Sequence, residues 1–308
     1  MLKVSVVVPV KNEGSSIKAL LDSLLTQSRV PDEIVITDGG STDKTISTIE
    51  EYSKKNSCIK LICLPHAFPG KGRNTSISHS RYDIIASVDA GCVPERDWLE
   101  KLIKPFEEDY ETDIVFGSYK PAPKTLLEKC FVTATEPFGY STSVASLALK
   151  KNVWRAADGY PEGLIAGEDT MFKSRLFKGG FKIKYAYDAL IYWKPRSTMK
   201  DFFKQFYRQA RSGGIIGASP NFYIRKMILF FVLFCLIFAG IRLNSYFLLV
   251  TFLMYFVWIG MTVIKHYGWF EDIKNKPQTY LVLPVVFIVR DIAQISGFLS
   301  GLVRKVRR

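Results

Sequence analysis

Two long apolar segments near the C-terminus constrain the fold most. Met227–Ile241 contains no charged side chain, and Tyr246–Ile264 gives nineteen further residues without a charge. A helix needs about 20 residues to cross the apolar core of a bilayer, and flanking Arg and Lys side chains can extend to the membrane surface. The linker between the segments, "RLNS", permits only a helical hairpin. Because both segments are apolar all round, they predict a membrane hairpin rather than a buried hairpin of a soluble domain.

A third apolar segment, Tyr280–Val303, is harder to place. It contains Pro284 and carries Arg290 and Asp291 near its middle, and these two charges could pair inside a span. Basic residues gather before the first apolar segment, after the second and in the terminal "RKVRR". Cytoplasmic loops are rich in Lys and Arg, so the N-terminal part is expected on the cytoplasmic side of a multi-pass cell-membrane protein. A third full crossing would put the basic tail outside, and we therefore expect a re-entrant or interfacial segment.

Residues 1–198 alternate between strand and helix patterns. Apolar side chains from Ile17 to Leu25 predict a helix, and Ser41 or Thr42 is expected to cap the next one. Apolar runs predict strands at Val4–Val10, Glu33–Thr37, Ile59–Leu64, Ile84–Val88 and Ile114–Gly117. This rhythm predicts an α/β fold with a mostly parallel sheet flanked by helices. Such sheets bind ligands at the carboxyl ends of their strands.

Polar residues follow several of these strands. Asn12 and Glu13 come after Pro9 in the turn that ends the first strand. Asp38 ends the second strand before two glycines, and Asp89 ends the fourth. A carboxylate at a strand tip can accept hydrogen bonds from a base edge or a ribose. The alternative is turn formation, because Asp, Gly and Ser are ordinary turn residues.

Two further stretches could serve a phosphorylated ligand. The glycines of "FPGKGRNTSI" let a loop backbone approach a ligand, and Lys71 and Arg73 offer charge to phosphate, although the stretch is not a P-loop. After the fourth strand, Ala90 and Gly91 are too small to cover Asp89. Mg²⁺ and Mn²⁺ prefer carboxylate oxygens and share them with phosphates. Asp89 therefore suits a divalent cation bound to a diphosphate.

Taken in order, "VVVPVKNEG", "TDGGSTDKT", "GKGRN" and "VDAGC" resemble the motifs of family 2 glycosyltransferases with a GT-A fold. The resemblance covers residues 3–215. It implies inverting transfer of a sugar from a nucleotide sugar, with Mg²⁺ or Mn²⁺ on the diphosphate and Asp89 as its ligand. The family usually has Asp-x-Asp here, and the missing second carboxylate bears on metal affinity more than on fold. "VDAGC" and "YWKPRST" are most similar to succinoglycan-type glucosyltransferases, which also lack the second Asp.

The stretch "GLIAGEDTMF" places Glu168 and Asp169 after a glycine. In the family this matches the Glu-Asp motif, whose Asp is the general base. An inverting displacement requires the acceptor hydroxyl to lose its proton as it attacks the anomeric carbon, and a positioned carboxylate can take that proton. Without the other motifs, the pair would be interpreted as acidic residues favoured at a helix start by the helix dipole. The resemblance implies Asp169 as the base, beside Glu168.

The stretch "FKQFYRQAR" resembles the Gln-x-x-Arg-Trp motif of membrane-bound family members, with Gln209 in place of Trp. On a helix, its basic residues would lie on one side and its aromatic residues on the other, which suits a bilayer surface. Arg208 could instead bind the donor diphosphate with its planar guanidinium. A helix that packs its Phe residues on the domain is the third possibility.

These motifs predict three parts of the chain: a catalytic domain at 1–198, an amphipathic interfacial helix region at 199–225, and the membrane hairpin with the third apolar segment at 226–308. Glu168 and Asp169 are the predicted catalytic residues. The predicted nucleotide-sugar site combines residues from all the motifs: Pro9, Asn12, Glu13, Asp38, Gly70, Lys71, Arg73, Asn74, Asp89, Ala90, Gln205 and Arg208.

The predicted function is transfer of a sugar from a UDP- or GDP-linked donor to a lipid-linked acceptor, either a polyprenyl phosphate or a polyprenyl-diphosphate glycan. The alternatives are a processive polysaccharide synthase and a non-catalytic nucleotide-sugar-binding membrane protein. The net charge of +13 suggests an anionic partner. Because the basic residues gather around the apolar segments and no nucleic-acid-binding module is present, we do not expect a nucleic-acid partner.

Overall fold

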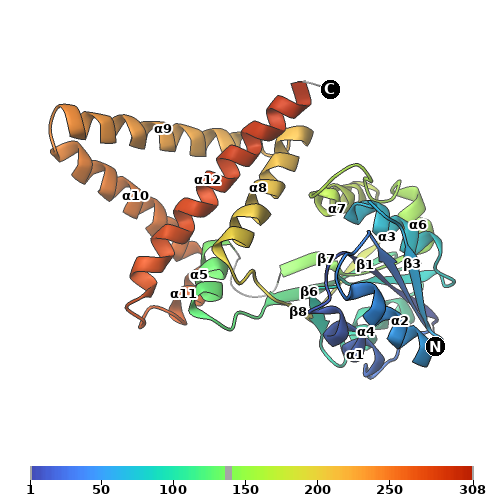
Figure 1. Ribbon diagram of the computed structural model, residues 1–308. Helices are drawn as coiled ribbons and strands as arrows, with labels where there is room; N and C mark the ends of the chain where they lie inside the picture. The colour runs from blue at the N-terminus through green and yellow to red at the C-terminus, as the bar shows by residue number, and fades with distance from the viewer. Residues whose placement is uncertain (1, 136–140, 307–308) are drawn as a thin grey trace. The chain divides into compact units, whose positions relative to one another are not determined.

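The computed structural model describes residues 2–135 and 141–306 and divides the chain into two compact units. The first, called here the sheet unit, comprises Met1–Ala122 and Tyr140–Lys194. The second, the helical unit, comprises Pro123–Gly139 and Pro195–Arg308. Figure 1 shows a sheet flanked by helices in the first unit and long helices in the second.

A mixed sheet forms the centre of the sheet unit. Its strands in the described residues are β1 (Val4–Val10), β2 (Glu33–Asp38), β3 (Ile59–Cys63), β4 (Ile84–Ser87), β5 (Cys92–Pro94), β6 (Ile114–Pro121), β7 (Ser141–Lys150) and β8 (Ile183–Trp193). They are ordered β3-β2-β1-β4-β7-β6-β8-β5. Strands β1 to β4 pair in parallel, as does β6 with β8, whereas β7 is antiparallel to β4 and β6, and β5 is antiparallel to β8.

The predicted α/β class is confirmed, and all five predicted strands are present as β1, β2, β3, β4 and β6. The sheet is less uniformly parallel than expected because β5 and β7 run against their neighbours. Three strands were not predicted. Of these, β8 is largely half-buried or exposed along its first half, so it lacks the continuous apolar run of a covered strand.

Helices cover both faces of the sheet. In the sheet unit these are α1 (Ile17–Leu25), α2 (Thr45–Lys55), α3 (Pro69–Ser78), α4 (Trp98–Glu108), α6 (Lys151–Ala156) and α7 (Glu168–Lys178). Side chains alternate across a strand: Val6 and Val8 of β1 join a core with α1, α2 and α4, whereas Val7 joins a second core with α3, α6 and α7. The two groups of helices therefore lie on opposite faces (Figure 1).

Two local predictions were wrong. Helix α2 begins at Thr45 with Lys44 at its N-cap position, so neither Ser41 nor Thr42 caps it. The Ser41 hydroxyl instead donates to the carboxylate of Asp38 at 2.5 Å. The glycine-rich stretch after β3 is not a loop but helix α3. It begins with Pro69, whose fixed φ suits the first position of a helix.

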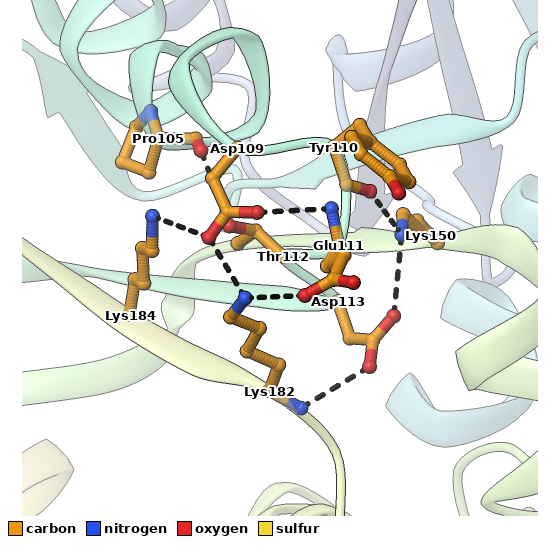
Figure 2. A network of polar contacts seen from close by, with 9 residues as sticks. All are labelled: Pro105, Asp109, Tyr110, Glu111, Thr112, Asp113, Lys150, Lys182 and Lys184. Atoms are coloured by element: carbon orange, nitrogen blue, oxygen red, sulfur yellow. Dashed lines mark hydrogen bonds and ion pairs between the residues drawn. The ribbon is translucent and has the colours of Figure 1, made fainter.

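A network of ion pairs fixes the edge of the sheet at which β6 and β8 begin (Figure 2). Asp109, after α4, lies 3.0 Å from both Lys182 and Lys184, and Asp113 lies 3.3 Å from Lys150. Hydrogen bonds from Lys184 and Lys182 lower the pKa of Asp109 to about 2. The network joins the α4–β6 connection to β7 and β8. It lies at the amino ends of the parallel strands, opposite the edge where such sheets bind ligands.

The helical unit contains α5 (Leu126–Thr135), α8 (Met199–Ile216), α9 (Pro220–Arg242), α10 (Tyr246–Lys265), α11 (Tyr267–Glu271) and α12 (Thr279–Val306). Helices α9 and α10 form the predicted hairpin. Within the described residues, α9, α10 and α12 are each long and apolar enough to cross a membrane. Many large apolar side chains of α9 and α10 are exposed, so the hairpin presents an apolar surface to its surroundings.

Helix α12 is one continuous helix that packs closely against α8. A Cβ atom at Gly297 would lie 2.3 Å from the carbonyl oxygen of Tyr207, and one at Gly301 would lie 2.2 Å from that of Arg211. Two glycines four residues apart allow helix backbones to approach in this way. The interfacial or re-entrant placement of this segment stays a prediction.

The charged residues in the middle of α12 are paired, as the sequence allowed. Arg290 Nη2 lies 2.7 Å from Asp291 Oδ1, and Lys226 Nζ of α9 lies 2.5 Å from the same oxygen. All three side chains are buried. On α8, Phe202 is buried with its ring centroid 4.2 Å from that of Phe131, so part of the aromatic side of α8 packs inside the unit.

Candidate active site

The turns after β1 and β2 are locked together by polar side chains. Asn12 adopts a left-handed conformation (φ 55°), and its Oδ1 accepts a hydrogen bond of 2.8 Å from the amide of Thr42. Asp38 is buried, and its Oδ1 accepts from the amides of Gly40 and Ser41 at 2.8 Å each. Asp38 therefore stabilises the turn that follows it, as one of the two interpretations predicted. Asn12 is exposed at the tip of β1.

Glu13, in the turn after β1, bonds α2 and lies beside the turn that follows β4. Its amide donates to Thr45 Oγ1 at 2.8 Å, and its carboxylate accepts from the Ser16 hydroxyl. Both carboxylate oxygens lie 3.8 Å from the position of a Cβ at Gly91, in the turn after Asp89. Burial, followed by the charges of Asp89 and Glu13, raises the pKa of the Cys92 thiol well above its usual range. The raised pKa favours the neutral thiol, which is a weak nucleophile.

Arg73 on α3 is the centre of the site. Its Nη2 donates to Asp89 Oδ1 at 2.6 Å and its Nη1 donates to Glu168 Oε1 at 2.7 Å. The side chain of Arg73 is only 5% exposed, that of Glu168 7%, and that of Asp89 39%. The end of β4 and the start of α7 are thus held by one guanidinium, with the accessible carboxylate on the β4 side.

Burial and charge act in opposite directions in this cluster. Burial lowers the pKa of Arg73, but the charges of Asp89 and Glu168 outweigh it and the net shift is upward, so Arg73 stays protonated. Burial raises the pKa of Glu168, and the charge of Asp169 adds to this, whereas Arg73 opposes it. Removing one member of a buried ion pair leaves an uncompensated charge, which typically costs about 3–5 kcal/mol. The cluster is therefore sensitive to any change at Arg73.

Asp169 follows Glu168 in the first turn of α7. The residue before them, Gly167, has a φ of 86°, a conformation that glycine adopts most readily. Asp169 is half-buried, and its Oδ1 accepts from the amide of Thr170 at 2.7 Å. Glu168 and Asp169 thus form the acidic first turn of a helix, as the alternative interpretation of the pair predicted. This arrangement also places Asp169 directly beside a residue that bonds Arg73.

The remaining predicted residues of the sheet unit lie around this cluster. Gly70 is needed for close approach, because a Cβ there would lie 2.2 Å from the carbonyl oxygen of Pro161. Lys71 is exposed and Ala90 is buried. Pro9 packs against α3, 3.4 Å from the position of a Cβ at Gly72.

Asn74 is fully occupied within the protein. Its Oδ1 accepts from Trp154 Nε1 at 3.0 Å and from the amide of Tyr160 at 2.9 Å. Its Nδ2 donates to the carbonyl of Tyr160 at 2.8 Å and to Glu162 at 3.1 Å. An amide side chain has two hydrogen-bond donors and two acceptor sites. All four are used here, so Asn74 holds the segment around Tyr160 and has no free group to bind a nucleotide sugar.

Two predicted donor residues, Gln205 and Arg208, lie on α8 in the helical unit. Gln205 Oε1 accepts from Arg196 Nε at 3.2 Å, and Arg208 is exposed. Their assignment to the donor stays a prediction. Among the described residues, no group of three or more His, Cys, Asp or Glu side chains could hold a metal ion.

Tyr160, which lies beside the cluster, was not predicted from the sequence. Its ring centroid is 5.4 Å from the guanidinium carbon of Arg73, and its hydroxyl is buried without a hydrogen-bond partner in the described part of the chain. Gly159 and Pro161 on either side mark a turn, but nothing in that pattern indicates that the turn carries an aromatic ring to Arg73.

Comparison with known proteins identifies the family. Residues 5–129 match the model of Glycosyl transferase family 2, and residues 74–262, more than half of the chain, match that of Glycosyl transferase family group 2. The dolichyl N-acetyl-α-D-glucosaminyl phosphate 3-β-D-2,3-diacetamido-2,3-dideoxy-β-D-glucuronosyltransferase of Methanococcus voltae is 24% identical over 98% of this chain and 97% of its own length. The probable glycosyltransferase YdaM of Bacillus subtilis is 25% identical over 68% of this chain, which spans 54% of YdaM.

Two solved structures share the fold. TarS 1–349 of S. aureus in complex with UDP-GlcNAc is 22% identical, with a TM-score of 0.53 over 68% of this chain and 66% of that one. The mannosyltransferase PcManGT of Pyrobaculum calidifontis, in complex with GDP-Man and Mn²⁺, is 17% identical, with a TM-score of 0.56 over 95% and 86%. At these identities the likeness supports the fold alone. The chain therefore belongs to the family 2 glycosyltransferases, and its sheet unit has the GT-A fold.

Proposed function

We propose that this glycosyltransferase moves a sugar, with inversion, from a UDP- or GDP-linked donor to a lipid-linked acceptor at the cytoplasmic face of the cell membrane. One observation carries the proposal: Asp89 and Glu168, from two distant motifs, bond the same buried guanidinium of Arg73. These contacts support a common site for Asp89, the proposed donor-side carboxylate, and Glu168, which directly precedes the proposed base, Asp169.

On the donor side, Asp89 is the residue that would hold the cation. It is more than one-third exposed and only its Oδ1 bonds Arg73, so part of the carboxylate faces outward. A single such carboxylate fits Mg²⁺ or Mn²⁺ that arrives with a diphosphate, because Mg²⁺ commonly takes one or two carboxylates and completes its shell with phosphates and water. The cation would neutralise charge on the leaving diphosphate. The complexes of TarS with UDP-GlcNAc and of PcManGT with GDP-Man and Mn²⁺ support this class of donor.

On the acceptor side, Asp169 takes the proton of the attacking hydroxyl. The hydroxyl oxygen forms a bond to the anomeric carbon from the face opposite the diphosphate, the bond from that carbon to the diphosphate breaks, and the anomeric configuration inverts. A positioned base of this kind contributes about 10²–10⁴-fold to the rate. Asn12 and Glu13 at the tip of β1 and Asp38 at the tip of β2 are assigned to the nucleoside.

The helical unit supports a lipid-linked acceptor. Helices α9, α10 and α12 have the length and composition of membrane spans, which would keep the enzyme at the membrane where such acceptors lie. The M. voltae relative acts, by its name, on a dolichyl phosphate that carries N-acetylglucosamine. We propose a polyprenyl phosphate or a polyprenyl-diphosphate glycan as the acceptor.

The test is an assay of the full chain in lipid nanodiscs with a panel of UDP- and GDP-sugars and a lipid extract, with and without Mn²⁺. We expect one donor to give nucleotide release and a labelled glycolipid, and Asp89→Ala to abolish both. Asp109→Asn, at the opposite edge of the sheet, is the matched acidic control and should keep both. Nucleotide release that is unchanged in Asp89→Ala would contradict the proposal.

A further inference from the structure

The turn at residues 157–159, which precedes the predicted catalytic residues Glu168 and Asp169, has an unusual backbone. Asp158 and Gly159 follow each other with φ values of 58° and 53°. Non-glycine residues rarely adopt positive φ, and such conformations persist only where the surroundings impose them. A Cβ at Gly159 would lie 2.8 Å from Asn74 Oδ1. The turn therefore packs closely against α3, and there is no room for a side chain at position 159.

Two side chains hold this turn from opposite sides. Arg175 of α7 points its Nη1 at the carbonyl oxygens of Ala157, Asp158 and Gly159, at 3.3, 3.0 and 3.1 Å. Asn74 of α3 binds the backbone of the next residue through both its oxygen and its nitrogen. One guanidinium nitrogen facing three consecutive carbonyls favours this turn over an extended chain.

The turn determines where Tyr160 lies, and Tyr160 lies against the site. Its ring centroid is 3.9 Å from that of Phe172 and 5.4 Å from the guanidinium carbon of Arg73. Arg73 in turn bonds Asp89 and Glu168. A continuous series of contacts thus runs from Arg175 through the turn and Tyr160 to the central guanidinium.

We propose that Arg175 is a positioning residue for sugar transfer. By fixing the turn at 157–159, Arg175 holds Tyr160 against Arg73. Arg73 in turn keeps Glu168, and with it the adjacent Asp169, in position relative to Asp89, which we assign to the nucleotide sugar. This inference rests on the proposed function, in which Asp169 is the base. Arg175 touches the turn and acts through it.

The experiment compares three variants of the full chain in nanodiscs. Arg175→Gln removes the carbonyl contacts, and Gly159→Ala displaces the same turn without touching Arg175. Both should lower kcat for transfer by about 10–100-fold with little change in donor KM, because small misplacements near reacting groups have effects of this size. Arg175→Lys should recover part of the loss, because an ammonium can still reach a carbonyl.

Arg155→Gln is the matched control. Arg155 lines the same 580 Å³ cavity as Arg175, but its side chain is exposed and makes no hydrogen bond or ion pair with the described residues. It should keep the wild-type kcat. Transfer at the wild-type rate in Arg175→Gln would overturn the inference, as would equal losses of transfer and donor hydrolysis in both turn variants. If the wild-type chain released no nucleotide from any donor, the proposed function itself would fail.

Discussion

Two ionic networks lie at opposite edges of the same sheet and differ in burial. At the carboxyl edge, Arg73 is buried between Asp89 and Glu168. At the amino edge, Asp109 pairs with lysines whose side chains are 44% and 34% exposed (Figure 2). Exposed ion pairs contribute little to stability, whereas a buried charge depends strongly on its partners. The comparison indicates that the buried Arg73 network fixes the positions of Asp89 and Glu168, whereas the exposed Asp109 network places no such restriction on the proposed site.

The first prediction tests the buried network. Arg73→Gln should leave two carboxylates facing each other without a cation, which destabilises the sheet unit by about 3 kcal/mol and removes transfer activity. Arg73→Lys, which keeps the charge but not the forked geometry, should recover stability more than activity. Denaturation of the purified variants, together with the transfer assay, measures both effects. Wild-type stability in Arg73→Gln would show that the burial of this network has no energetic consequence.

The second prediction extends the comparison to the helical unit, where two cations share one buried carboxylate. Asp291→Asn leaves Lys226 and Arg290 without their anion, and should lower stability in detergent by about 3 kcal/mol. Donor hydrolysis per folded molecule should not change, because these residues belong to the helical unit. A thermal unfolding curve and a nucleotide-release assay of the same sample separate the two effects. A loss of hydrolysis at unchanged stability would contradict this assignment.

The third and smallest effect is expected at the exposed network. Because the lysines depress the pKa of Asp109 to about 2, its ion pairs stabilise the fold above the usual Asp pKa of about 4. That contribution is lost as the pH falls through 2. Asp109→Asn should therefore be slightly less stable than the wild type at pH 7, and the difference should shrink as the pH approaches 2. Denaturant titrations at several pH values measure it. A difference that grows with acidity would have the wrong sign.

The sequence predicted the strands of the first half well because β1, β2 and β4 are buried along almost their whole length and carry runs of apolar residues. It also singled out Asp89, Glu168 and Asp169, since ordered motifs carried them, and their roles stay predictions. It could not show that Arg73 faces carboxylates rather than phosphate, because the bonds join residues 16 and 95 positions apart. It missed Arg175 for the same reason: its partners are three backbone carbonyls and the carboxylate of Asp158, 17 positions away, and no motif links these residues.

The most direct test of the central claim is the ratio of sugar transfer to donor hydrolysis in Asp169→Asn, measured with saturating donor and acceptor in nanodiscs. The carboxylate at Asp89 is intact in this variant, and the amide at position 169 cannot take a proton. We expect transfer to fall by about 10²–10⁴-fold while slow hydrolysis of the donor continues. Transfer at the wild-type rate, with Asp169 replaced, would contradict it.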